Sequence, residues 1–91
     1  MATNVDPDIA QELQAAMRAL EPHGFSLTAT KGSGMMFTAD FRSDKAFLQI
    51  VKDRGFWFLN GETDDLKRHP SRKSLGAVVR DALDWIGKNV T

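Results

Sequence analysis

The sequence predicts an α+β fold, a two-layer sandwich in which a four-stranded antiparallel meander carries both terminal helices on one face. Two observations predict it. Apolar residues recur at helical spacing near both ends of the chain, and between these ends they alternate with polar residues. Alternation at every second position is typical of half-buried antiparallel strands. Predicted turns, two of them containing glycine, separate the alternating stretches, so we expect the element order α-β-β-β-β-α.

Composition narrows the class of protein. The chain has 91 residues, of which 42% are hydrophobic and 26% charged, so we predict a single ordered domain over residues 1–91. Twelve Lys and Arg balance twelve Asp and Glu, so no overall field steers the protein to nucleic acid. The chain contains no cysteine, which excludes disulfides, cysteine-based zinc sites and thiol nucleophiles.

The first residues carry no sorting signal that we can identify. Met1–Val5 is expected to be disordered, and the start lacks the basic residues and apolar run of a signal peptide. No stretch approaches the roughly 20 apolar residues that a membrane helix needs. We therefore expect a cytoplasmic protein without a membrane partner.

The first helix is predicted to begin after Asp6 and to end after Glu21. Asp6 is a suitable N-cap and Pro7 suits the first helical position, whereas Pro22 and Gly24 do not continue a helix. Its apolar stripe consists of Ile9, Leu13, Met17 and Leu20.

Four strands follow between residues 25 and 60, and their turns predict the register. We expect a three-residue loop at 32–34, a two-residue loop at 43–44 and a three-residue loop at 53–55. The expected opposing pairs are Lys31 with Met35, Phe41 with Ala46, and Ile50 with Phe58. Opposed residues share a face, which gives one apolar core face: Phe25, Leu27, Ala29, Met35, Phe37, Ala39, Phe41, Ala46, Leu48, Ile50, Phe56 and Phe58.

The opposite sheet face is predicted to be polar over the first two strands and apolar over the last two. Large exposed apolar patches mark partner sites, and tryptophan is enriched among residues that dominate binding. We therefore predict a partner-binding surface formed by Met36, Phe47, Val51, Trp57 and Leu59. A homodimer is the simplest outcome, since closed two-fold pairing is the commonest assembly.

Two alternatives remain for this face. A one-residue shift in the last turn would exchange Trp57 and Leu59 with Phe56 and Phe58, although the apolar excess would remain. The connection at residues 61–73, or the tail after Gly87, could instead fold across the face and cover it.

A polar connection leads to the last helix and contains the second candidate site. A short fifth strand around residues 62–66 is possible, and the helix is expected to begin near Ser71 or Ser74 and to end near Gly87. Its predicted buried stripe is Leu75, Val79, Ala82, Leu83 and Ile86, with Val78 and Trp85 on a flank. Basic residues at a helix start could bind phosphate or nucleic acid: Lys67, Arg68, Arg72 and Lys73. Glu62, Asp64 and Asp65 lie just upstream and could neutralise them.

No catalytic or metal-binding pattern stands out. His23 and His69 are far apart, and neither has a second ligand at metal spacing. We therefore predict a non-enzymatic protein-interaction module without cofactor or metal, working as an adaptor, inhibitor or immunity-type protein. Nucleic-acid or phosphate recognition through the basic start of the last helix is the alternative.

Overall fold

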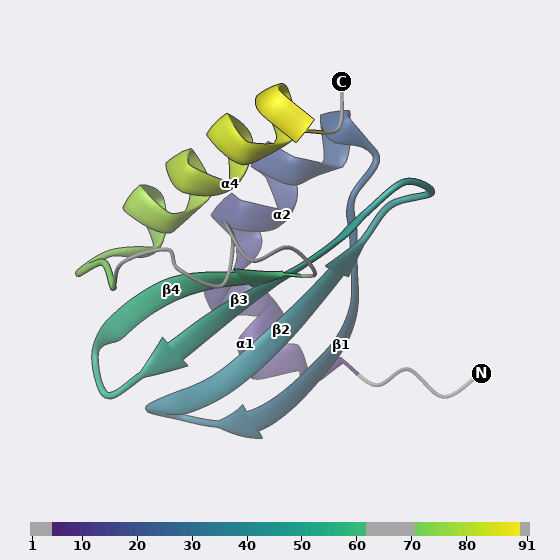
Figure 1. Ribbon diagram of the computed structural model, residues 1–91. Coiled ribbons are helices and arrows are strands. Elements are labelled where there is room, and N and C mark those ends of the chain that lie inside the picture. The colour runs from purple at the N-terminus through teal and green to yellow at the C-terminus, as the bar shows by residue number, and fades with distance from the viewer. Residues whose placement is uncertain (1–4, 62–70, 90–91) are drawn as a thin grey trace.

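A four-stranded antiparallel sheet in the order β1-β2-β3-β4 carries all the helices on one face, as predicted (Figure 1). The computed structural model describes residues 5–61 and 71–89. The strands are β1 (Ser26–Ser33), β2 (Met36–Arg42), β3 (Phe47–Asp53) and β4 (Phe56–Gly61). The helical layer consists of α1 (Pro7–Glu12), α2 (Gln14–Leu20), the short 3-10 helix η1 (Glu21–His23) and α4 (Leu75–Asn89).

The first helix begins where the sequence places it but is divided in two. The Asp6 carboxylate accepts hydrogen bonds from the N–H groups of Asp8 at 2.8 Å and Ile9 at 3.4 Å, which caps α1. Leu13, with φ −93° and ψ 10°, separates α1 from α2. Its N–H still donates to the Ile9 carbonyl at 3.0 Å, so the two segments remain hydrogen-bonded end to end.

The last helix is capped by Ser74, one of the two predicted starts. The Ser74 hydroxyl accepts from the Ala77 N–H at 3.2 Å. The centre of the buried stripe differs from the prediction, because Val78 and Trp85 are buried together with Ala82 and Ile86. The predicted stripe residues Leu75, Val79 and Leu83 are only partly buried and pack against the core. The helix is therefore rotated so that the predicted flank faces the sheet.

All three predicted loops differ from the observed turns. Gly34 and Met35 alone connect β1 to β2, so Ser33 lies opposite Met36 rather than Lys31 opposite Met35. Ala29 therefore lies opposite Asp40 and leaves the core face on which it was predicted. A bulge at Thr28 then shifts the register by one residue, so Leu27 lies opposite Phe41 and remains packed against the core.

The turn between β2 and β3 is longer than predicted, but the residues of β3 stay on the sheet faces that were predicted for them. Phe41 lies opposite Leu48 rather than Ala46, because four residues form the loop. The Ser43 N–H donates to the Ala46 carbonyl at 2.9 Å and closes this loop. A shift of two residues preserves the side on which each residue lies.

The turn between β3 and β4 is one residue shorter than predicted, and this difference exchanges the faces of β4. Arg54 and Gly55 both have positive φ, 51° and 89°, as a two-residue type I′ turn requires. Asp53 consequently lies opposite Phe56, and Ile50 lies opposite Leu59 rather than Phe58. Trp57 and Leu59 enter the core.

One hydrophobic cluster lies between the helices and the sheet. Its buried members are Ile9, Leu13, Ala16, Leu20, Phe25, Phe37, Ala39, Phe41, Leu48, Ile50, Trp57, Leu59, Val78, Ala82, Trp85 and Ile86. Met35 and Phe56, both predicted in the core, are instead 66% and 49% exposed.

Some predictions fall on parts of the chain that are not described. The possible strand at 62–66 lies outside the described residues, as do residues 1–4 of the predicted disordered end; Val5 is partly buried. Among the described residues, no helix is long and apolar enough to cross a bilayer.

Candidate docking face

The sheet face turned away from the helices is built from cross-strand rows of side chains. At the end of the sheet with the two short turns, the outermost row consists of Ser33, Met36, Asp53 and Phe56, which we call the outer row. The next residue of each strand points to the helix-covered face. These residues, Gly32, Phe37, Lys52 and Trp57, form what we call the inner row. The next row on the outer face contains Lys31, Thr38, Val51 and Phe58.

Large apolar side chains gather at this end of the face, which we call the apolar end: Met35, Met36, Val51, Phe56 and Phe58. Met35 is 66% exposed, Met36 56% and Phe56 49%, whereas Val51 and Phe58 are half-buried. The Arg54 N–H donates to the Met35 carbonyl at 2.9 Å and ties the two turns together. The exposed side chains are therefore carried by a connected pair of turns.

Two shallow hollows flank Asp53 on this end of the sheet. One, of about 220 Å³, is lined by Met36, Thr38 and Val51 among others, with Lys31 at its margin. The second, of about 370 Å³, is lined by Asp53, Arg54, Phe56, Phe58 and Ser71. Apolar groups of a partner would find both protruding side chains and depressions here, as a complementary interface requires.

The centre of the outer face is polar and is satisfied by its own hydrogen bonds. The Gln49 side-chain amide donates to Asp40 Oδ1 at 2.7 Å, and Asn60 Nδ2 donates to Gln49 Oε1 at 3.3 Å. These three residues form a ladder across β2, β3 and β4. At the far end of the face, the Arg42 guanidinium lies 4.6 Å from the centre of the Phe47 ring, a cation–π contact.

Three of the five predicted partner-binding residues lie on this face, and two do not. Met36, Phe47 and Val51 are there. The placement of Trp57 and Leu59 was wrong, because they are only 7% and 1% exposed. The type I′ turn reverses their direction, so they contact the core.

Phe56 and Phe58 take the positions that the sequence analysis gave to Trp57 and Leu59. The sequence predicts their exposure only if the last turn shifts by one residue. The available signal was the Arg54-Gly55 pair, which suits a two-residue hairpin if Arg54 adopts a left-handed conformation.

The charges around the apolar end are few and of both signs. Arg54 Nε lies 3.1 Å from Asp53 Oδ1, and the Arg54 side chain is 78% exposed. Lys31 is exposed on the neighbouring strand. The described residues therefore give this end of the face no strong field of either sign.

In the second predicted site, the basic start of the last helix, Arg72 is paired with a carboxylate of the same chain. Arg72 Nε lies 2.7 Å from Asp81 Oδ2, and Arg72 Nη2 donates to Asp81 Oδ1 at 3.0 Å. This hydrogen bond and the charge of Asp81 raise the pKa of Arg72. Lys73 is exposed, while Lys67 and Arg68 lie outside the described residues.

Arg72 also contributes its backbone to the sheet. The Trp57 N–H donates to the Arg72 carbonyl at 2.7 Å, and the Arg72 N–H donates to the Trp57 carbonyl at 2.6 Å. Arg72 therefore has two structural roles, as an isolated bridge beside β4 and as the partner of Asp81 on α4. Because its guanidinium is paired with Asp81, the Arg72 side chain is less available to bind an external anion.

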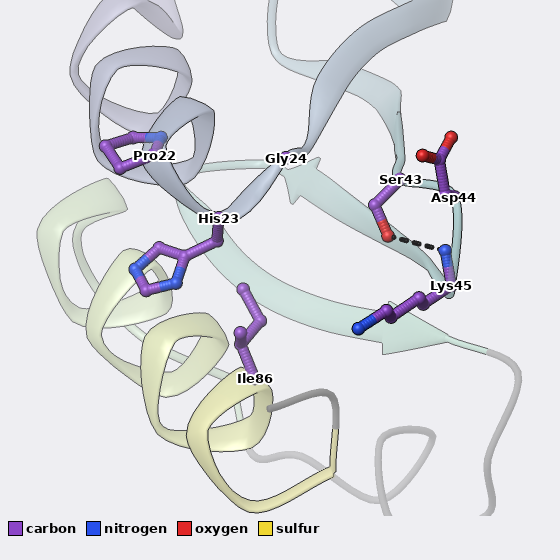
Figure 2. A pocket seen from close by; sticks show the side chains of 7 residues that line it. All are labelled: Pro22, His23, Gly24, Ser43, Asp44, Lys45 and Ile86. Carbon is purple, nitrogen blue, oxygen red and sulfur yellow. Dashed lines mark hydrogen bonds between the residues drawn. The ribbon is translucent and has the colours of Figure 1, made fainter.

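A third feature is a corner pocket of about 340 Å³ at the other end of the sheet (Figure 2). It is lined by Pro22, His23, Gly24, Ser43, Asp44, Lys45 and Ile86. No sequence pattern indicates this pocket, because its three segments are distant along the chain. No group of three or more His, Cys, Asp or Glu side chains with metal-site geometry occurs within residues 5–61 and 71–89.

Comparison of the chain with protein-family models, with curated proteins and with solved structures finds no match.

Proposed function

We propose that this chain is a small non-enzymatic protein-interaction module, of the adaptor, inhibitor or immunity type, that docks through the apolar end. The observation that carries the proposal is the joint exposure of Met35, Met36 and Phe56, in and beside two turns that a backbone hydrogen bond ties together. Burying such side chains contributes about 25 cal/mol per Å² of apolar surface removed from water. We propose the cytoplasm as its location.

The partner that fits this surface first is a second copy of the chain. A strongly charged partner would find little to pair with among residues 5–61 and 71–89, where the charges nearest the apolar end are Lys31, Arg54 and Asp53. A second copy presents the same apolar side chains and the same Asp53–Arg54 pair. Around a two-fold axis, these pairs can meet one another with opposite signs facing, as an isologous interface requires.

The test is the molecular mass in solution of the wild-type chain and of a Met36→Gln/Phe56→Gln double variant. We expect the wild type to approach dimer mass by about 100 μM, where micromolar affinities are saturated, and the double variant to remain monomeric. Both substitutions are at exposed positions, so the thermal melt should be nearly unchanged. Phe47→Gln, on the same face but at the far end, is the matched control and should still dimerise.

A wild-type chain that stays monomeric would contradict pairing between copies. A dimer that persists in the double variant would contradict the use of the apolar end. Retained dimerisation in the Phe47→Gln control confines the interface to the apolar end.

A further inference from the structure

The two most exposed side chains of the apolar end are adjacent methionines. Met35 is 66% and Met36 56% exposed, and Met36 also lines the hollow of about 220 Å³ on the sheet face. The chain has four methionines and no cysteine, so every sulfur atom in it belongs to a thioether. Met17, on α2, is partly buried and packs against the core. These three thioethers therefore differ in their access to a dissolved reagent.

The backbone at Met35 and Met36 is held by contacts that do not involve their side chains. The Met35 carbonyl accepts from the Arg54 N–H at 2.9 Å. Met36 lies opposite Ser33 on β1 and opposite Asp53 on β3, so it is part of the sheet. A chemical change confined to the two thioethers can therefore alter the surface and leave the fold in place.

We propose that Met35 and Met36 form a reversible modification site, at which oxidation by a peroxide separates two paired copies of the chain. This inference rests on the proposed pairing through the apolar end. The sulfur lone pair attacks one oxygen of hydrogen peroxide, so an S–O bond forms while the O–O bond breaks. Sulfur is oxidised by two electrons, and the departing hydroxide takes the proton of the transferred hydroxyl and leaves as water. The product is methionine sulfoxide.

The sulfoxide changes the two side chains from apolar to polar. Its oxygen is hydrated in the separate chain, and burying it in an interface without a donor is unfavourable. In a two-fold pair each methionine occurs twice, so complete oxidation at both positions places four sulfoxides in one interface. The oxidised pair should therefore dissociate, while each separate chain keeps its sulfoxides in water.

Pairing and oxidation are expected to oppose each other. A pair that buries both thioethers shields them, so the peroxide reacts with the separate chain and holds it in that state. A methionine sulfoxide reductase reverses the change: two thiols become a disulfide, the sulfoxide oxygen leaves as water and the thioether is restored. The apolar end would thus bind a second copy only in its reduced form.

The experiment measures the dissociation constant of the pair by sedimentation equilibrium before hydrogen peroxide, after it, and after repair by a methionine sulfoxide reductase. Peptide mass spectrometry identifies the methionines that have gained oxygen. We expect Met35 and Met36 to be oxidised before Met17, the dissociation constant to rise at least about tenfold, and repair to restore it. Oxidation at Met35 and Met36 should also be slower at about 100 μM chain than at about 1 μM, because pairing shields them.

Two leucine variants assign the effect to its site. Met35→Leu/Met36→Leu keeps apolar side chains of similar volume without sulfur, so it should pair equally well with and without peroxide. Met17→Leu is the matched control: it removes the partly buried thioether, and peroxide should still separate its pairs. An unchanged circular dichroism spectrum of the oxidised Met17→Leu variant would show that the fold survives at the concentration where pairing is lost.

The outcomes separate this inference from the proposal on which it rests. A chain that is monomeric before peroxide would overturn the pairing itself and this inference with it. Pairs that persist after complete oxidation of Met35 and Met36 would overturn this inference alone. Equal oxidation rates at Met17 and Met36, or separation of the Met35→Leu/Met36→Leu variant by peroxide, would overturn it as well.

Discussion

Two neighbouring cross-strand rows at the same end of the sheet behave in opposite ways. The inner row places Trp57 against Phe37, with ring centres 5.8 Å apart and planes at 79°, and leaves Trp57 7% exposed. The outer row leaves Met36 and Phe56 about half exposed. Hydrophobicity does not explain the difference, because both rows carry large apolar side chains. The turn at Arg54-Gly55 explains it, because it determines which sheet face each side chain of β4 points to.

The inner row buries even its charged residue, Lys52, more fully than the outer row buries Phe56. Lys52 Nζ lies 5.2 Å from the centre of the Trp57 ring and 5.7 Å from that of Phe37, and its ammonium pairs with Glu12 on α1. The hydrocarbon stem covers the aromatic pair while the charged end reaches the helix layer. A row is thus buried by what packs over it, and in the described part of the chain the helices cover the face of the inner row and not that of the outer row (Figure 1).

The largest expected effect separates the two rows directly. Trp57→Ala should lower the free energy of unfolding by about 3–5 kcal/mol, because it opens a cavity beside Phe37. Phe56→Ala should change it by less than about 1 kcal/mol, because that ring is half exposed. Urea denaturation followed by circular dichroism measures both. Equal losses would contradict the observed register of β4.

Gly32 in the inner row should tolerate no side chain. Its φ is 95°, and an added Cβ would lie 2.5 Å from the Met36 carbonyl oxygen. We expect Gly32→Ala to destabilise the chain by about 1–3 kcal/mol, because both the left-handed conformation and the clash must be relieved. Gly76→Ala is the control: it lies in α4 with open space around it and should stabilise by up to about 1 kcal/mol. A neutral Gly32→Ala would show that β1 can move away from β2.

The pairing of Lys52 with Glu12 should contribute a smaller amount. A double-mutant cycle with Lys52→Gln and Glu12→Gln should give a coupling energy of about 0.5 kcal/mol, because Glu12 remains partly solvated. The coupling should shrink in 1 M salt, where charges are screened. A coupling that is large and independent of salt would indicate that the pair is held in a drier environment than its exposure implies.

The smallest effect concerns the turn that sets the two rows apart. Arg54 is the one non-glycine residue with positive φ within residues 5–61 and 71–89. Arg54→Asn should stabilise the chain by about 0.5 kcal/mol, because asparagine adopts the left-handed conformation more readily and Asn-Gly is preferred in type I′ turns. Arg54→Val is the opposite control and should destabilise. A loss on Arg54→Asn would mean that the Asp53–Arg54 contact outweighs the turn.

The sequence predicted the layers and the strand order because those depend on strong local signals. Asp6 and Ser74 cap helices as expected, and Thr38, Asp40 and Arg42 leave no choice about which face of β2 is polar. In β4, apolar residues occupy both faces, so alternation alone does not choose between Phe56 and Trp57. That choice depends on a single turn residue whose left-handed conformation its side chain does not favour.

The candidate sites were predicted unevenly for the same reason. The apolar excess of the outer face was found, with Met36, Phe47 and Val51 correctly placed, because it survives a register shift. The engagement of Arg72 by Asp81 depends on how α4 lies beside the sheet, which no local pattern reports. The corner pocket unites His23, Lys45 and Ile86, and only the tertiary fold brings them together.

The irregularity of β1 has a consequence for aggregation. β1 is a border of the sheet, and borders with open backbone groups invite strands of other chains to add. The bulge at Thr28 and the positive φ of Gly32 break the straight run of donors and acceptors that an added strand would need. This border is therefore a poor template for endless stacking of strands.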